Sequence, residues 1–304
     1  MAVLRLGTRG SQLALWQANY VADRLRPVLD PRPVELVIIE THGDQVQDRP
    51  LASLGGFGVF TKAIQEALLA NRVDVAVHSL KDLPTIPVPN SVLAAVPPRG
   101  PNGDALVSLK HSRFADLPMG ALVGTSSLRR KAQLLNRRKD LRIVDLRGNV
   151  ETRLRKLSEQ NLDAIVLAEA GLLRLGLGDA ITEVLNPNWM LPAVGQGAIG
   201  LECREDDANS RHLVEAVNDP ATLNAVRAER AMLWALGGGC LVPIGALSKV
   251  EGNTLTLRGA VLSPDGSRKI VDTCRGPLDQ PMNIGGELAA RLMSAGAREL
   301  LSLL

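Results

Sequence analysis

A single cysteine, Cys240, directly follows three consecutive glycines, Gly237–Gly239, in the last quarter of the chain. Glycine carries no Cβ, so the three residues let the backbone turn sharply and leave the neighbouring thiol unshielded. A helical pattern over 222–236 precedes the motif and a strand-like run follows it, which places Cys240 at the tip of an element. Such a thiol could hold a covalently attached group. An ordinary glycine helix cap followed by a small core cysteine has the same pattern, so the motif alone leaves both readings open.

Four short motifs share a second arrangement, in which a strand ends, small hydroxyl or glycine residues follow, and then basic residues. They are Gly7–Ser11, His78–Pro84, Gly124–Arg130, and Leu146–Val150 with Arg153 one turn further on. Helix N-termini at the carboxyl ends of strands offer free N–H groups and partial positive charge, which suits anions. Each motif by itself fits a capped helix with solvated arginines. Together they predict a cationic site for several carboxylates; phosphate is less favoured because no Walker motif is present.

Asp82 is the one carboxylate among these cationic motifs, next to Lys81. Its type and place suit an acid–base group or a counter-ion for a positively charged intermediate, although a salt-bridged loop residue before a proline fits as well. His78 closes an apolar strand, and we expect it to be packed and hydrogen-bonded. Cys203 and Cys274 lie in strand-like runs and are expected to be structural.

Strands and helices alternate over the first two thirds of the chain, which predicts two α/β lobes with mainly parallel sheets covered on both faces. A helix over Gln12–Leu29 shows an apolar stripe at helical spacing. Hairpin signals and a terminal helix over 286–301 predict a small α+β domain. The expected helical stripe is Ala14, Ala18, Val21, Leu25 and Val28. The predicted domains are 1–98 with 198–217, 103–192, and 220–304, with glycine-rich crossings at 99–104 and 193–199.

Composition excludes several classes of protein. The chain has 304 residues, 45% hydrophobic and 22% charged, with a net charge of +3, which is typical of a globular protein. Only eight of the 35 basic residues are lysine, and aromatic residues make up 2%, so the arginines suit a small polyanionic ligand better than nucleic acid. No secretory signal or membrane span is expected. Three widely spaced cysteines predict no metal site and suit the cytoplasm.

The motifs together closely resemble the porphobilinogen deaminase (hydroxymethylbilane synthase) family of tetrapyrrole biosynthesis. The resemblance runs in order from about Leu4 to the C-terminal helix. It includes Leu191–Ala198, Ala228–Arg230 and Gly238–Gly245 besides the four motifs above.

The resemblance implies a transferase that joins four porphobilinogen molecules into a linear tetrapyrrole. It elongates a dipyrromethane cofactor held in thioether linkage by Cys240, with Asp82 as the catalytic residue. A monomer without nucleic-acid or membrane partners is expected. The residues implied as binders of cofactor and substrate carboxylates are Arg9, Ser11, Ser79, Lys81, Thr125, Ser127, Arg129, Arg130, Arg147, Arg153, Arg174 and, as a cleft contact, Gln196.

The chain departs from the family pattern at two places. Phe57 stands in a predicted lid where the family usually has lysine, and the crossing 99–104 keeps Arg99 and Asp104 but lacks the family's other charged residues. The alternative from another class is a small-anion binding or sensor protein, because periplasmic binding proteins also consist of two α/β lobes with two crossings. An attached third domain with an exposed thiol has no role in simple binding, which favours the enzyme. A nucleic-acid binder is the weaker alternative.

Overall fold

The computed structural model describes residues 3–40, 61–239 and 242–303. The chain forms two compact units, Met1–Gly100 with Ala198–Leu223, and Pro101–Gly197 with Asn224–Leu304. It therefore passes between the units at Gly100–Pro101, at Gly197–Ala198 and inside helix α8 (Pro220–Ala235). None of the helices in the described ranges is both long enough and apolar enough to cross a membrane.

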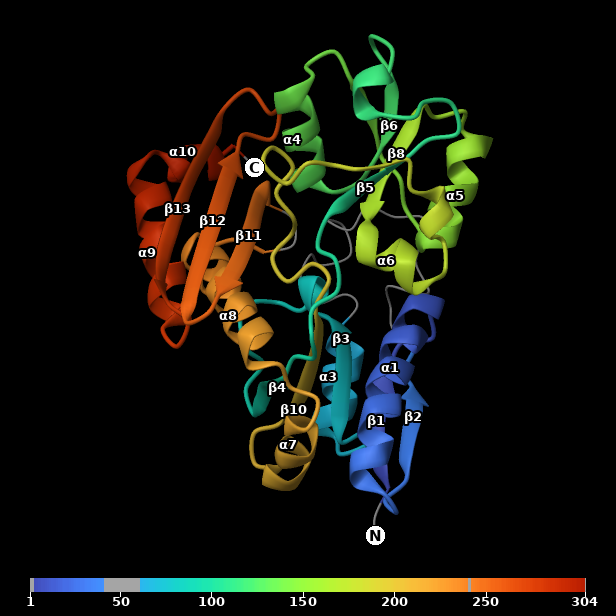
Figure 1. The fold of residues 1–304 in the computed structure, drawn as a ribbon, viewed down its shortest axis with the longest axis vertical. Coiled ribbons are helices and arrows are strands. Elements are labelled where there is room, and N and C mark those ends of the chain that lie inside the picture. The colour runs from blue at the N-terminus through green and yellow to red at the C-terminus, as the bar shows by residue number, and fades with distance from the viewer. Residues whose placement is uncertain (1–2, 41–60, 240–241, 304) are drawn as a thin grey trace. The chain divides into compact units, whose positions relative to one another are not determined.

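The first unit is a five-stranded sheet in the order β2-β1-β3-β10-β4, with a helix on each face. Helix α1 covers one face of the sheet, where its Val21 and Leu25 pack with Leu4 and Leu6 of β1. Helix α3 packs on the opposite face. In Figure 1 the elements from β1 to β4 form the blue and cyan part of the ribbon, and β10 and α7 of the same unit are yellow to gold. The elements are β1 (Leu4–Thr8), α1 (Gln12–Leu29), β2 (Val34–Ile38), α3 (Lys62–Leu69), β3 (Val75–Ser79), the 3₁₀ turn η2 (Leu80–Asp82), β4 (Ser91–Ala95), β10 (Ile199–Arg204) and α7 (Ala208–Glu215).

The second unit holds a similar five-stranded sheet in the order β7-β6-β8-β5-β9. Helix α4 packs on one face and helices α5 and α6 on the other. The elements are β5 (Asp104–Val107), η3 (Phe114–Asp116), β6 (Leu122–Gly124), α4 (Leu128–Arg137), β7 (Arg142–Val144), α5 (Val150–Glu159), β8 (Ala164–Ala168), α6 (Glu169–Arg174), η4 (Gly178–Ala180) and β9 (Glu183–Val184).

Both sheets are mixed in the same way. β1 pairs in parallel with β2 and β3, and β6 pairs in parallel with β7 and β8. The strand that runs against its neighbours is β10 in the first sheet and β5 in the second, and each follows directly after a passage of the chain between units. The predicted fold class, two α/β lobes with mainly parallel strands, is confirmed. The carboxyl ends of the parallel strands meet at one edge of each sheet, where the predicted motifs begin.

The C-terminal part of the second unit is an antiparallel sheet, β11 (Ile244–Glu251), β12 (Thr254–Leu262) and β13 (Lys269–Pro277), covered by α8 and α9 (Pro281–Ser294). The prediction of one terminal helix over 286–301 was wrong. Helix α9 starts earlier, and the left-handed backbone of Gly296, with a φ of 100°, separates it from α10 (Ala297–Leu301).

The turn between β12 and β13 packs directly on helix α4. A Cβ on Gly266 would lie 2.4 Å from the carbonyl oxygen of Ala132, and the side-chain amide of Asn136 donates to the Gly266 carbonyl at 2.8 Å. Ala132 also shares an apolar cluster with Ala260 and Leu262 of the C-terminal sheet. The C-terminal sheet therefore supports helix α4, whose first turn holds the predicted Arg129 and Arg130.

Candidate functional site

In the first unit, the predicted residues lie where β1 and β3 end. The hydroxyl of Ser11 accepts from the Ala14 N–H at 3.4 Å and so caps helix α1. The Ser79 hydroxyl donates to the Gln17 amide oxygen at 3.0 Å and accepts from its nitrogen at 2.8 Å. These bonds tie the end of β3 to α1, so the loop with Arg9 and Ser11 and the turn with Lys81 and Asp82 share one edge of the sheet. Sequence reasoning assigned no role to Gln17, which is buried.

Asp82 lies on a short, well-anchored turn. Leu80 and Leu83, on either side of Lys81 and Asp82, are 1% and 4% exposed. The Leu80 N–H donates to the Ala198 carbonyl at 3.0 Å, and the Leu83 N–H donates to the Leu80 carbonyl at 3.2 Å. Lys81 and Asp82 themselves are half-buried. The two leucines therefore fix the backbone while leaving the carboxylate within reach of a ligand.

His78 is buried behind this turn, as predicted. Its Nε2 lies 2.9 Å from a carboxylate oxygen of Glu202, in an arrangement too poorly aligned to count as a hydrogen bond. The Gln65 amide also donates to Glu202, at 2.9 Å. The packing of His78 is confirmed, and its Nε2 lies within ion-pair distance of Glu202.

In the second unit, two capped helices start after β6 and β7. The Ser127 hydroxyl accepts from the Arg130 N–H and caps α4, and the Thr125 hydroxyl accepts from the Ser127 N–H. Asn149 caps α5 in the same way. The Ser126 hydroxyl accepts from the Leu146 N–H at 2.9 Å and donates to the Leu146 carbonyl, which joins the loop of the first helix to that of the second.

Three further predicted arginines lie around the second helix start and the crossing. Arg147 belongs to the loop that Ser126 holds, and Arg153 donates from Nε to the Gly148 carbonyl at 2.8 Å. Gly148 has a φ of 112°, a backbone conformation that favours glycine. Arg174, at the end of α6, donates to the Gly197 carbonyl at 2.7 Å. The structure thus gives Arg153 and Arg174 backbone anchors close to glycine-rich loops.

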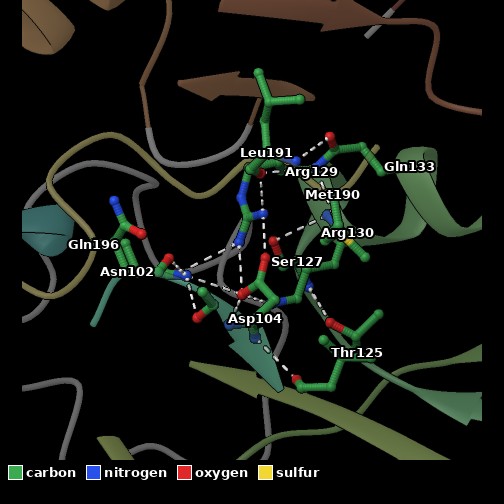
Figure 2. A network of polar contacts seen from close by, with 12 residues as sticks. Asn102, Asp104, Thr125, Ser127, Arg129, Arg130, Gln133, Met190, Leu191 and Gln196 are labelled. Atoms are coloured by element: carbon green, nitrogen blue, oxygen red, sulfur yellow. Dashed lines mark hydrogen bonds and ion pairs between the residues drawn. The ribbon is translucent and has the colours of Figure 1, made fainter. Parts of the chain in front are cut away.

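Arg129 and Arg130 converge on Asp104, the first residue of β5 (Figure 2). Arg129 reaches both carboxylate oxygens, and Arg130 donates to Oδ1 from Nε at 2.9 Å and from Nη2 at 2.8 Å. Arg129 also donates to the Leu191 carbonyl and Arg130 to the Val166 carbonyl. Asp104 is fully buried and each arginine is 5% exposed. Two guanidinium groups and one carboxylate leave this cluster one net positive charge.

The sequence places Asp104 at the first crossing, but its pairing with Arg129 and Arg130 was not predicted. Burial by itself raises the pKa of its carboxyl, but the charges of Arg129 and Arg130 and the bonds from Arg129 and Gln196 outweigh it and hold the pKa well below its usual range. One local signal for this ion pair was available: Asp104 stands at the start of an apolar run. A carboxylate that is buried with such a run needs a cationic partner, which the arginines supply.

The ion pairs of Asp104 predict a specific dependence of stability on pH. Because the folded pKa is lowered, the contribution of Asp104 is complete above the unfolded pKa of about 3.9 and is lost as the pH falls through the lower folded value. Asp104→Asn should lower stability at pH 7 by about 3–5 kcal/mol, the cost of breaking a buried ion pair. The gap in Tm between the wild type and this variant should then narrow below about pH 4. A gap that stays constant into that range would contradict the assignment.

Two of the three cysteines are buried in apolar cores. Cys203 of β10 is 0% exposed, and burial raises the pKa of its thiol to about 12. Cys274 of β13 is 2% exposed, and burial raises the pKa of its thiol as well. Thiols of this kind are poor nucleophiles, so both are structural, as predicted. Cys240 and Phe57 lie outside the described residues.

The donor set fits a ligand that carries several carboxylates. In each unit, hydroxyl caps and basic side chains gather at the carboxyl ends of parallel strands, and the buried cluster in the second unit retains a positive charge. Forked arginine donors match carboxylate geometry, and helix starts add N–H groups. The arrangement therefore suits small polyanionic molecules bound through acidic side arms.

Comparison with known proteins gives consistent matches over almost the whole chain. Residues 4–212 match the family model for the porphobilinogen deaminase dipyrromethane cofactor binding domain, and residues 223–294 match that for the porphobilinogen deaminase C-terminal domain. Porphobilinogen deaminase of Geobacter metallireducens is 51% identical over 98% of this chain and 94% of its own length. That of Geobacter sulfurreducens is 50% identical over the same shares. Among solved structures, a periplasmic substrate-binding protein of Coxiella burnetii aligns with 75% of this chain and 97% of its own, at 19% identity and a TM-score of 0.45.

Proposed function

The chain belongs to the porphobilinogen deaminase family, and we propose which of its residues carry out the reaction. The enzyme deaminates four porphobilinogen molecules and joins them head to tail into the linear tetrapyrrole hydroxymethylbilane. When bound, the dipyrromethane cofactor supplies the primer from which the chain grows. In each condensation a C–N bond breaks, ammonia leaves, a C–C bond forms to the free pyrrole carbon, and that carbon loses a proton.

Asp82 is the catalytic residue in this proposal. Its carboxylate stands on an anchored turn at the edge where Lys81, Arg9 and Ser11 also lie. A carboxylate there accepts hydrogen bonds from pyrrole N–H groups and offsets the positive charge that develops as ammonia leaves. It can also take up the proton that the pyrrole carbon loses. The observation that supports this role is a half-buried acid next to Lys81, on a turn fixed by the buried Leu80 and Leu83.

The acetate and propionate arms of substrate and cofactor are bound by the basic and hydroxyl residues of both units. Porphobilinogen carries two carboxylates, so a growing chain needs many cationic partners. Gln196 is bonded to Arg129 and belongs to the same set. The proposed binding residues are Arg9, Ser11, Ser79, Lys81, Thr125, Ser127, Arg129, Arg130, Arg147, Arg153 and Arg174, with Gln196 acting through Arg129.

Cys240 is the proposed point of attachment of dipyrromethane. The burial of Cys203 and Cys274 and the raised pKa of both thiols speak against either as the nucleophile. A thioether is not a free thiol, so the denatured holoprotein should titrate two thiols per chain with a disulfide reagent, although the sequence has three cysteines. Protein prepared without cofactor serves as the control and should titrate three. Three thiols in chromophore-bearing protein would exclude a thioether to cysteine.

Residues 1–98 with 198–217, 103–192, and 220–304 are proposed as three domains of a monomeric, cytoplasmic enzyme. The separate C-terminal sheet, β11-β12-β13, supports a third domain even though it shares a compact unit with the second lobe. Light scattering during size-exclusion chromatography tests the monomer: a mass of 32.5 kDa supports it, and twice that mass would contradict it.

Incubation of the purified protein with porphobilinogen tests the function directly. The expected result is four ammonia molecules released for each linear tetrapyrrole formed. Asp140→Asn is a suitable control, because Asp140 pairs with Arg138 on the surface of the second unit, outside the proposed site. Binding of porphobilinogen without ammonia release would instead favour the small-anion binding protein.

A further inference from the structure

The side-chain amide of Gln196 contacts four polar groups of the second unit (Figure 2). Its nitrogen donates to the carbonyls of Asn102 and Gly103 at 2.8 and 3.0 Å, and to Oδ1 of Asp104 at 3.0 Å. Its oxygen faces Nη2 of Arg129 at 3.5 Å. Three acceptors around the nitrogen and a cation beside the oxygen permit only this orientation of the amide. Gln196 is 1% exposed, so bulk water hardly competes for these bonds.

Gln196 also joins two segments that are far apart in the sequence. Asn102 and Gly103 follow directly after the first passage of the chain between units, and Gln196 comes just before the second. One amide therefore holds the first two of the three connections together on the side of the second unit, and the same amide contacts the cluster of Asp104 and Arg129.

Asp104 determines both the charge and the direction of the arginine pair. Its two oxygens receive Arg129 and Arg130 in forked arrangements, which leave each planar guanidinium group little freedom to rotate. Without this carboxylate, two buried guanidinium groups would repel each other. With it, the cluster keeps a single positive charge, which matches one carboxylate of a ligand.

We infer that Asp104 and Gln196 are positioning residues that aim Arg129 and Arg130 at one carboxylate of the tetrapyrrole chain and couple this pair to the first two of the three chain connections. The inference rests on the proposed function, because it assigns the arginines to carboxylate binding. Neither residue needs to touch the substrate: Asp104 acts through both arginines, and Gln196 acts through Arg129 and Asp104.

A purely structural role would give a different result from a positioning role. Loss of a structural contact lowers Tm and reduces the amount of active protein, but it leaves the KM of the surviving molecules unchanged. Loss of alignment weakens binding of the carboxylate and therefore raises KM while the chemical step, served by Asp82, continues. Gln196→Met distinguishes the structural role from the positioning role, because methionine has a similar length, suits a buried site and lacks the amide.

The experiment compares full-length Gln196→Met, Asp104→Asn and the control Asp140→Asn with the wild type. Asp140 is also an aspartate that pairs with an arginine in the second unit, but it is partly exposed and contacts Arg138. Three quantities are measured: Tm, the rate at which cofactor-free protein gains dipyrromethane mass on addition of porphobilinogen, and KM with kcat for the loaded enzyme. For Gln196→Met we expect a KM raised about tenfold, a kcat within about threefold and loading slowed about tenfold, with Tm lowered by a few degrees because the buried acceptors around the amide lose their donor. Asp104→Asn should load more slowly still, and Asp140→Asn should match the wild type in loading and KM.

Each outcome bears on the inference. Unchanged KM and loading in Gln196→Met would overturn it, and so would a fall in Tm accompanied by a lower kcat at constant KM. If Asp104→Asn does not fold, Gln196→Met alone decides. A wild type that neither carries dipyrromethane nor consumes porphobilinogen would instead overturn the proposed function. A loaded, active wild type that Gln196→Met matches in every measurement overturns only the positioning role.

Discussion

Asp82→Asn is expected to lower turnover of porphobilinogen by about 100-fold or more while the protein still folds and binds substrate. Asparagine has nearly the same shape but carries no negative charge and cannot take up a proton. The variant therefore loses both the stabilisation of the developing cation and the proton acceptor, each of which contributes about 100-fold in typical enzymes. The fold should persist because the turn is anchored by Leu80 and Leu83, not by the carboxylate. Steady-state kinetics together with Tm gives the answer.

Asp116→Asn provides a matched control for this substitution. Asp116 is likewise the last residue of a three-residue 3₁₀ turn, η3, and is exposed on the second unit away from the proposed binding residues. Its replacement should leave turnover near the wild-type value. Near-normal turnover by Asp82→Asn would remove Asp82 from the mechanism. A loss of turnover that follows a fall in Tm would assign it a structural role instead.

Cys240→Ser is expected to yield a folded protein that makes no detectable tetrapyrrole. A serine hydroxyl is a far weaker nucleophile than a thiolate, so no primer becomes attached and elongation has no starting point. Cys203→Ala and Cys274→Ala are the matched controls. Each removes one buried thiol at some cost in stability, but both variants should keep the attached dipyrrole and the activity. Product formation by Cys240→Ser at the wild-type rate would contradict the assignment.

The elements with strong local signals could be predicted from the sequence. Helix α1 spans Gln12–Leu29, with the predicted bounds. The stripe on α1 was wrong at its end: Val28 is 61% exposed, and Leu29 is buried instead. At 3.6 residues per turn Leu29 lies about 20° from Ala18 around the helix, whereas Val28 lies about 80° away, so the helical repeat itself favours Leu29.

Elements that depend on distant pairing were missed. Strands β4 and β5 lie among the prolines and the first crossing, where the local pattern indicated only loops. β4 pairs with β10, more than a hundred residues later, and β5 pairs with β8 and β9. Such strands are stabilised by partners far along the chain, and the short apolar runs in Ser91–Ala95 and Asp104–Val107 are weak local signals for a strand.

The sequence predicted where along the chain the site residues lie, but not which of their side chains contact one another. Sequence reasoning placed Ser11, Ser79, Ser127 and Arg130 after the correct strands, because capping residues and strand ends have local signatures. It did not find that Asp104 pairs with Arg129 and Arg130, or that the Gln196 amide is directed at them. Those contacts depend on how β5 enters the second sheet, which follows from the same distant pairing that was missed.

The most direct test of the account is the intact mass of the purified protein and of its Cys240→Ser variant. We expect the wild type to exceed its sequence mass by one dipyrrole, and the variant to show the sequence mass alone. Cofactor-free wild type should gain the same excess on incubation with porphobilinogen. A wild type that stays at its sequence mass after that incubation, or a variant that still carries the dipyrrole, would contradict a covalent primer on Cys240.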